Sequence, residues 1–456
     1  MRYAYFVTNY AKTGRVAVTS ALSVLATLPI TSFAYEPTSN LGKVGQTTLQ
    51  QQSGDAVTKV CGDLNRMGQS RSQQQDDLFD RCGNMVQNAN EIEGTGPVAK
   101  SLGLDAAQLG DAVQTVVTEE IASTRTMNKE IAAGQINSAI GRLSALRSAI
   151  ATGGGASADI TPKWGVFLNS HYGFGDRDGT DREDAFDYDR WGVTAGADYR
   201  VSDALVLGGL LSYSNIDSNF DVTEAVPGGG IDAESWGLGL YGTYYHDNWY
   251  MDGLVAYTQT DYDIDRRILL PLGEDPGTSP AVVETSRAAS SNTDSNDWAL
   301  SIGGGMDFNH ANLTYGPFVR LNYNSADMDG YSENGAFGLN LTVDGQSTES
   351  LTSVIGGRIS AAMSQEWGVL VPQARVGWIH EFLDDAESFT AFYTADPQRT
   401  PLIALSDEPD RDYFTLGVGI SAVLPGDIQA FFDYQTLLDN KYVNDHLFSL
   451  GVRAAF

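Results

Sequence analysis

The chain has 456 residues, with 58 acidic against 28 basic side chains and a formal net charge of −30 at neutral pH. Because nucleic-acid binding depends on basic side chains that displace counterions from phosphate, this balance excludes a nucleic-acid-binding protein, and it also opposes binding to anionic lipid headgroups. The 49 glycines, 21 tyrosines and 7 tryptophans indicate many turns and strands rather than an α/β enzyme.

Residues 1–34 have the features of a signal peptide that directs export. Arg2, Lys12 and Arg15 flank the start of the apolar run 16–28, and small side chains precede a cleavage site after Ala34. The apolar run is shorter than the roughly 20 residues that span a bilayer. A retained N-terminal membrane anchor is the alternative interpretation.

Residues 35–103 are predicted to form a short helical, passenger-like region. Both cysteines of the chain, Cys61 and Cys82, lie past the cleavage site and are bound for an oxidising compartment, so we expect them to form a disulfide that closes a small helical hairpin. A pair of metal ligands is the alternative, although the first histidine of the chain is His171.

Residues 104–155 are predicted to be an α-helical linker that continues into a pore helix. Its apolar residues recur every three or four positions, which is the spacing of one helix face. They include Ile136, Ile140, Leu143, Leu146 and Ile150. The three glycines at 153–155 end the helix.

From residue 163 onward the apolar period changes from 3.6 to 2, which predicts strands. In 413–424, for example, large apolar side chains alternate with small or polar ones. One apolar face would cover the core of a soluble sandwich or would face lipid in a membrane barrel. We predict twelve strands, at 163–172, 188–201, 204–214, 233–245, 248–262, 296–308, 311–323, 349–363, 368–383, 411–424, 427–437 and 446–456.

The predicted connections alternate between tight turns and long, mostly acidic loops. The tight turns lie at 202–203, 246–247, 309–310, 365–366 and 425–426. Outer-membrane barrels combine short periplasmic turns with longer external loops, and aromatic side chains form girdles near their strand ends. The pattern therefore predicts a twelve-stranded antiparallel transmembrane β-barrel over 156–456, preceded by a helical region that threads or precedes the pore.

The last predicted strand has an apolar face that ends in an aromatic residue. This face carries Phe448, Leu450, Val452 and Phe456. It resembles the C-terminal signature of bacterial outer-membrane proteins, which the barrel-assembly machinery recognises in that class.

The region 156–456 resembles the translocator domain of autotransporters, the type V secretion family. The resemblance rests on the strand segments 316–321 and 370–382, on Phe456 and on the preceding helix 135–147. It implies a monomeric barrel in the bacterial outer membrane and no cofactor. The implied partners are outer-membrane lipid, the barrel-assembly machinery, periplasmic chaperones and the export translocon.

Alternation along the strands predicts which charged side chains face the lumen. The predicted inward charges are Arg375, Glu381, Asp433 and Arg453. Arg142 and Arg147 of the predicted pore helix are expected to pair with inward carboxylates. The alternative is that solvent surrounds both arginines.

No catalytic constellation and no metal or cofactor motif is found, so the sequence predicts no enzyme. Asn128 and Asn137 match only by position the asparagine that cleaves the chain in some autotransporters. The dense carboxylates of 176–187 and 384–412 are interpreted as solvated charge, with calcium binding as the alternative, since the glycine of the EF-hand loop is missing.

Three functions stay open at this point. The first is an autotransporter barrel that inserts in the outer membrane and translocates or displays its own short N-terminal segment at the cell surface. The second is a porin-like passive channel plugged by its helix, with the helical region in the periplasm. The third is a small surface adhesin that acts through acidic external loops, among them the predicted loop 263–295.

Overall fold

The computed structural model describes residues 35–117, 123–127, 129, 131, 133–134, 136, 141, 163–223 and 227–456. The predicted signal peptide lies outside these described residues, as do Asn128, Asn137, Arg142 and Arg147. Residues 37–456 form one compact unit. None of the helices within the described ranges has the length and apolar composition to cross a membrane.

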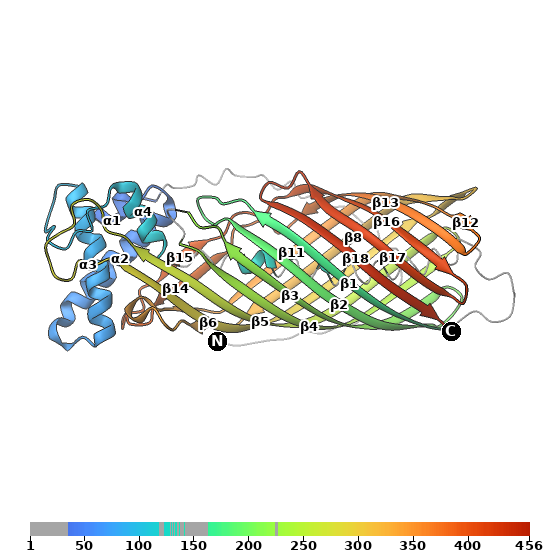
Figure 1. Ribbon diagram of the computed structural model, residues 1–456, viewed down its shortest axis with the longest axis horizontal. Helices are drawn as coiled ribbons and strands as arrows, with labels where there is room; N and C mark the ends of the chain where they lie inside the picture. Colours follow the sequence, from blue (N-terminus) through green and yellow to red (C-terminus); the bar gives the residue numbers. More distant parts are fainter. Residues whose placement is uncertain are drawn as a thin grey trace, which may run out of the picture. The chain divides into compact units, whose positions relative to one another are not determined.

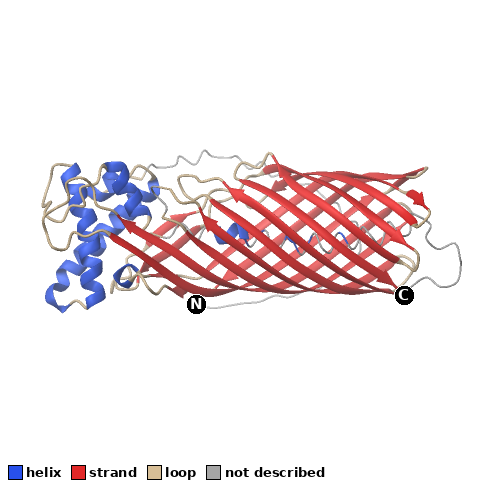
Figure 2. Cartoon of the chain, in the orientation of Figure 1, coloured by secondary structure: helices blue, strands red, loops and turns tan. Residues whose placement is uncertain are grey.

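Twelve antiparallel strands close into a barrel, as predicted, with β1 paired to β18 and β8 paired to β11 (Figures 1 and 2). In order around the barrel the strands are β1 (Trp164–Arg177), β2 (Phe186–Arg200), β3 (Leu205–Phe220), β4 (Gly229–His246), β5 (Trp249–Leu270), β6 (Thr285–Met306), β8 (Leu313–Met328), β11 (Gln346–Ala361), β13 (Gly368–Glu381), β16 (Asp412–Leu424), β17 (Ile428–Leu438) and β18 (Val443–Ala455).

The five predicted tight turns lie at one end of the barrel, which we call the turn end. The connections at the other end, the loop end, are longer, apart from residues 439–442 between β17 and β18. At the turn end, β7 (Phe308–His310) and β12 (Met363–Gln365) extend two hairpins. At the loop end, a separate four-stranded sheet has the order β15 (Leu402–Leu405), β14 (Ser388–Tyr393), β10 (Leu341–Val343) and β9 (Tyr331–Ser332). The 3₁₀-helix η3 (Phe337–Leu339) lies between β9 and β10.

The outer face of the barrel is apolar between two aromatic girdles. On β4, Leu238 and Leu240 are 64% and 67% exposed between the girdle residues Trp236 and Tyr244. On β5 the same two girdles lie at Trp249 and Tyr257, whose rings contact Tyr244 and Trp298 respectively. At about 3.3 Å per residue and a tilt near 40°, these eight steps along β5 span roughly 20 Å, which matches the apolar band of an outer-membrane barrel.

Beyond the girdle at the loop end, β5 and β6 continue as a tall hairpin. Asp261, Asp263 and Asp265 face outward into water, whereas Tyr262 and Ile264 between them are buried. The predicted loop 263–295 is therefore wrong over most of its length, because β5 reaches Leu270 and β6 begins at Thr285. The acidic residues led to the prediction of a loop, but they form the solvent-exposed face of a strand, in which side chains alternate with period 2.

Residues 37–117 form a helical body at the loop end, which we call the cap. It consists of α1 (Asn40–Val44), α2 (Thr48–Met67), the 3₁₀-helix η1 (Gly68–Ser70), α3 (Gln73–Ile92) and α4 (Ala106–Gln114). Capping boxes start α2, α3 and α4, at Thr47, Ser72 and Asp105. A disulfide joins Cys61 of α2 to Cys82 of α3, with a Cα–Cα distance of 5.8 Å.

The core of the cap is completed by residues of the barrel. Leu64, Leu78 and Leu109 represent α2, α3 and α4 in a single buried cluster. The same cluster includes barrel and loop residues, namely Ile268, Leu270, Ala289, Ala336, Leu339, Leu341, Tyr393, Ala395 and Leu402. The cap and the loop end of the barrel thus bury their apolar side chains in a common core.

Candidate functional site

A helix lies inside the barrel and runs from the loop end toward the turn end. Its described residues are 123–127, 129, 131, 133–134, 136 and 141. Met127 and Ile131 pack with Phe186 and Tyr188, which start β2 at the loop end. Ile136 packs with Val206 near the β2–β3 turn. The described residues up to 117 therefore lie on the loop side of the lumen.

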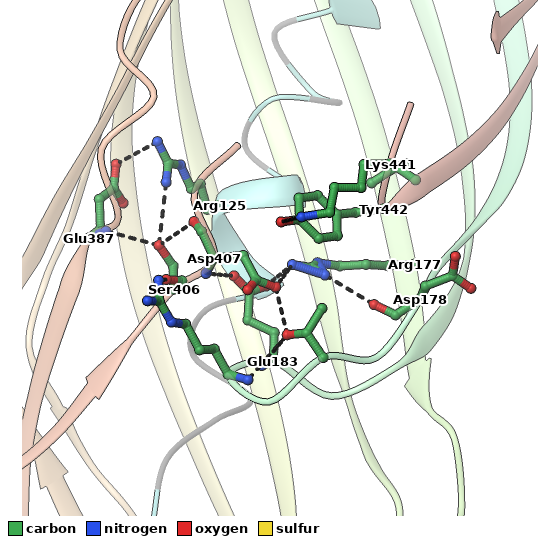
Figure 3. A network of polar contacts seen from close by, with 12 residues as sticks. Arg125, Arg177, Asp178, Glu183, Glu387, Ser406, Asp407, Lys441 and Tyr442 are labelled. Atoms are coloured by element: carbon green, nitrogen blue, oxygen red, sulfur yellow. Dashed lines mark hydrogen bonds and ion pairs between the residues drawn. The ribbon is translucent and has the colours of Figure 1, made fainter. Parts of the chain in front are cut away.

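Arg125 anchors the helix at the loop end of the lumen (Figure 3). We call the ring of loops around this end of the lumen the mouth of the barrel. Its Nη2 atom lies 3.2 Å from Oε1 of Glu387, and its Nη1 donates to Oγ of Ser406 at 3.4 Å. The amide of Glu387 donates to the same Ser406 hydroxyl at 2.9 Å. Arg125 is only 8% exposed, so these contacts replace the water around its charge.

Arg177, at the end of β1, forms a second centre in the mouth (Figure 3). Its Nη2 lies 3.0 Å from Oε2 of Glu183 and 2.7 Å from Oδ2 of Asp407. The amide of Asp407 donates to Glu183 Oε1 at 2.7 Å. Carboxylates from the two acidic loops, which the sequence suggested were solvated or calcium-binding, thus gather around arginines.

Burial shifts the pKa of two carboxyl groups in the mouth. It raises the pKa of Glu183, and Arg177 opposes that shift without overcoming it. Burial also raises the pKa of Glu387, with Arg125 opposing. Within the described ranges, no group of three or more His, Cys, Asp or Glu side chains is arranged to hold a metal ion.

One helical turn deeper, Lys129 meets Glu381 at the end of β13. Lys129 Nζ lies 3.1 Å from Oε2 of Glu381, which is fully buried. Barrel groups fix this carboxylate independently of the helix: Ser350 Oγ donates to it at 2.6 Å, and the amide of Leu351 donates at 2.9 Å. Glu381 is therefore a prearranged anion that faces the helix.

The remaining predicted inward charges lie along the wall of the lumen. Arg375 forms a bidentate pair with Asp433, at 2.6 and 2.7 Å, and also donates to Gln435. Arg453 lies opposite Gln429 in the β17–β18 register, near the turn end. Phe448, Leu450, Val452 and Phe456 follow the outward face, and the last three are 57%, 49% and 70% exposed.

Sequence reasoning missed Arg125 and Lys129, which the structure places against lumen carboxylates. The signal that could have found them is their spacing of four, which puts two cations on one helix face. Of the five histidines, His380 contacts Asp412 and His446 contacts Tyr434 on the outer face of the barrel, whereas His171 lies beside Gly134 of the helix.

The described residues of the helix leave part of the lumen open. A cavity of about 300 Å³ lies between Arg125, Lys129 and Ala133 of the helix and the opposite wall. Most wall residues come from β8, β11, β13, β16 and β17 and include Phe318, Asn322, Thr352, Arg358, Arg375, Thr415 and Gln435, and further lining residues come from β1, β2, β5 and β18. The other half of the helix surface packs against β2 to β5 through the two apolar clusters.

Three further contacts fasten the cap to the barrel. Arg266 of β5 pairs with Glu333 and donates to the carbonyl of Thr115, which follows α4, at 2.9 Å. Asp77 of α3 accepts two hydrogen bonds from Arg287 of β6, at 2.5 and 2.7 Å. The hydroxyl of Tyr393 donates to Val116 O at 3.2 Å.

The loop 271–284 clasps the extended segment 98–104 of the cap, backbone against backbone. The amides of Gly273 and Gly277 donate to the carbonyls of Leu102 and Ser101, both at 2.8 Å. A Cβ on Gly273 would meet the carbonyl oxygen of Gly103 at less than 2 Å, so only glycine permits this approach.

These features place a twelve-stranded barrel around a helix of its own chain, with apolar girdles outside and paired charges inside. The family model of the autotransporter beta-domain matches residues 166–435. The chain belongs to the autotransporter beta-domain family. Its barrel is accordingly a translocator of the bacterial outer membrane, and the autotransporter beta-domain itself is not an enzyme.

Two curated proteins and one solved structure are similar to this chain. The chain is 24% identical over 268 residues to lipase 1 of Photorhabdus luminescens and 23% identical over 349 residues to outer membrane protein A of Rickettsia rickettsii. These alignments cover 58% and 74% of this chain but only 38% and 15% of the relatives. The fold is similar to the translocator domain of the autotransporter NalP from Neisseria meningitidis, with a TM-score of 0.51, 15% identity, and coverage of 73% and 99% of the two chains.

Proposed function

We propose that the barrel exports residues 37–117 of its own chain and keeps them docked at the cell surface as the cap. The observation that carries this proposal is the direction of the lumen helix, with Arg125 at the loop end and Ile136 near the turn end. Outer-membrane barrels turn their short connections to the periplasm. A chain that leads from the cap at the loop end to β1 at the turn end must therefore have crossed the membrane.

The exported segment stays attached because its core is shared with the barrel. Arg266, Arg287 and Tyr393 bind it through side-chain contacts, and the loop 271–284 binds it through the backbone. In this proposal 1–34 is the signal peptide, 35–103 the passenger-like region, 104–155 the linker with the pore helix and 156–456 the barrel. Helix α4, within the linker, packs as part of the cap.

The partners follow from the same proposal. The outward face of Phe448 to Phe456 is the signal for the barrel-assembly machinery, and the export translocon and periplasmic chaperones act before it. In this proposal the barrel is a monomer, and its closed ring of strands leaves no open edge at which a second copy could add a strand. The chain needs no cofactor and is not an enzyme: lipase 1 takes its name as a whole protein, of which this chain spans 38%.

Cell-surface exposure of the cap tests the proposal. A protease cleavage site is inserted between Gly94 and Gly96, in an exposed loop of the cap, and whole cells are treated with that protease. We expect cleavage on intact cells. The matched control carries the same site in the β4–β5 turn at Asp247, where cleavage should require permeabilised cells. Cleavage of the cap only after permeabilisation would refute the proposal.

A second candidate, a porin-like channel, is favoured by the 300 Å³ cavity beside the helix. Conductance of the purified chain in planar bilayers tests it. Under our proposal the ionic current stays small until the helix is deleted, whereas a porin would conduct with the helix in place.

A further inference from the structure

We propose that Arg125 and Lys129 set the register at which the exported chain stops in the barrel. This inference rests on the proposed function, because it concerns a chain that has moved outward through the lumen. The two cations and the two carboxylates that receive them act as a two-point stop, which fixes how much of the chain lies outside. Arg125 and Lys129 are thus positioning residues for the translocation step.

The first argument is the spacing of the cations. Between Tyr35 and Lys163 the basic residues are Lys43, Lys59, Arg66, Arg71, Arg81, Lys100, Arg125, Lys129, Arg142 and Arg147. Only Arg125 and Lys129 lie four residues apart. In a helix this spacing places both cations on the same face, about 6 Å apart along the axis. Every basic side chain N-terminal to Arg125 would pass the same two carboxylates without a second cation on its helix face.

The second argument is that the barrel prepares the two receiving anions. Glu381 is fully buried and is held by Ser350 Oγ and the amide of Leu351. The backbone of Glu387 is fixed by its hydrogen bond to Ser406. A single cation can satisfy one of these carboxylates, whereas Arg125 and Lys129 satisfy both at once. Because the second contact forms within a segment that is already bound, the two together hold far longer than either alone.

The third argument is that apolar packing agrees with only this register. When Arg125 meets Glu387, Met127 and Ile131 enter the cluster around Phe186 and Tyr188, and Ile136 enters the cluster around Val206. A shift by one residue would rotate the helix by about 100° and would move the apolar residues toward the polar cavity side. The charges and the apolar face therefore select the same position.

A charge-reversal series tests the stop in the full chain in its host membrane. A photo-reactive amino acid replaces Ala133, which faces the cavity, and mass spectrometry identifies the wall peptides that it cross-links. The variants are Arg125→Glu with Lys129→Glu, the reciprocal Glu381→Lys with Glu387→Arg, and all four changes together. The control, Arg375→Glu with Asp433→Arg, reverses an ion pair between two wall strands, β13 and β17.

We expect one dominant cross-linked peptide in the wild type and in the control. Each double reversal at the stop should reduce it by about tenfold or more and spread the cross-links along the wall, because two buried charges lose their partners. The quadruple variant should restore the dominant peptide. Heat-dependent mobility on gels checks that each barrel has folded.

An unchanged cross-link in the Arg125→Glu, Lys129→Glu variant, or a folded quadruple variant without restoration, would overturn the two-point stop. These results are distinguishable from failure of the proposed function. If export itself is wrong, the protease site at Gly94 stays protected in the wild type. If only the stop is wrong, that site is cleaved on intact cells, and the same dominant cross-linked peptide is found in the wild type and in every charge-reversal variant.

Discussion

Arg266 and Glu333 form a doubly hydrogen-bonded ion pair at the junction of cap and barrel. Arg266 Nε donates to Glu333 Oε1 at 2.8 Å and Nη2 to Oε2 at 2.7 Å, and the two side chains are 2% and 4% exposed. The same guanidinium reaches the carbonyl of Thr115 in the cap. A barrel strand, a loop-end connection and the cap therefore meet at one buried charge.

Substituting Arg266 by Met should loosen the cap without opening the barrel. The change leaves the Glu333 carboxylate buried and uncompensated, which costs about 3–5 kcal/mol. Hydrogen exchange of residues 37–117 in the detergent-solubilised chain should accelerate, while exchange in β13 to β18 stays slow. Arg399→Met is the control, because its pair with Asp344 is 62% and 53% exposed and is worth roughly 1 kcal/mol or less. Equal acceleration of hydrogen exchange in the two variants would contradict the claim that the Arg266–Glu333 pair holds the cap to the barrel.

Removing the disulfide should lower the stability of the cap alone. Cys61 and Cys82 are separated by 21 residues, and a loop of that size contributes about 3 kcal/mol by the chain-entropy estimate. We expect Cys61→Ala with Cys82→Ala to lower the melting temperature of the helical circular-dichroism signal, with the heat-dependent gel mobility of the barrel unchanged. Reduced wild-type protein should melt like the variant. If the double variant melts at the same temperature as the oxidised wild type, the disulfide does not stabilise the cap.

The buried carboxyls of the mouth predict a pH dependence with a defined sign. Burial raises the pKa of Glu183 and of Glu387 above the ordinary value near 4.3. Such groups bind their protons more tightly in the folded state, so folding loses stability as pH rises from the unfolded pKa through the raised folded pKa. Glu183→Gln with Glu387→Gln removes both titrations.

We therefore expect the wild type to gain stability relative to this double variant as the pH is lowered from neutral toward the ordinary glutamate pKa of about 4.3. Melting temperatures of the two proteins, measured side by side across that range, provide the comparison. A difference that stays constant or falls on acidification would show that these two groups do not carry the effect.

A charge on the lipid-facing wall should be costly in the apolar band and tolerated above it. Leu240 lies on the outer face of β4 midway between Trp236 and Tyr244, so Leu240→Arg should cost about 2–4 kcal/mol. Asp263→Arg, past the loop-end girdle on β5, should cost about 0–1 kcal/mol. Urea unfolding from lipid vesicles measures both. Equal losses would place the membrane elsewhere on the barrel.

The barrel could be predicted from local sequence patterns, because each strand shows an alternation of apolar and polar side chains and each tight turn contains turn-forming residues. The twelve strands and the Cys61–Cys82 disulfide were predictable for that reason. The tall β5–β6 hairpin was not. Its acidic residues 261, 263 and 265 face water in a strand, whereas acidic density alone suggests a loop. The apolar segments 389–393 and 402–405 are the signal that could have predicted the external strands β14 and β15.

The partners of the lumen helix depend on its register, which no local pattern contains. Arg142 and Arg147 were predicted to meet lumen carboxylates and lie outside the described residues, whereas Arg125 and Lys129 meet Glu387 and Glu381. The common core of cap and barrel escapes sequence reasoning for the same reason. Leu78 and Tyr393 are 315 positions apart and share a cluster only after folding.

A density map of the full chain in lipid nanodiscs tests the central claim most directly. We predict a helix inside the barrel, continuous with a disulfide-linked helical body that covers the end opposite the short turns. The guanidinium of Arg125 should lie against Glu387 at that end. A map with an empty lumen, or with the helical body at the end that carries Asp203 and Asp247, would contradict export of the cap through this barrel.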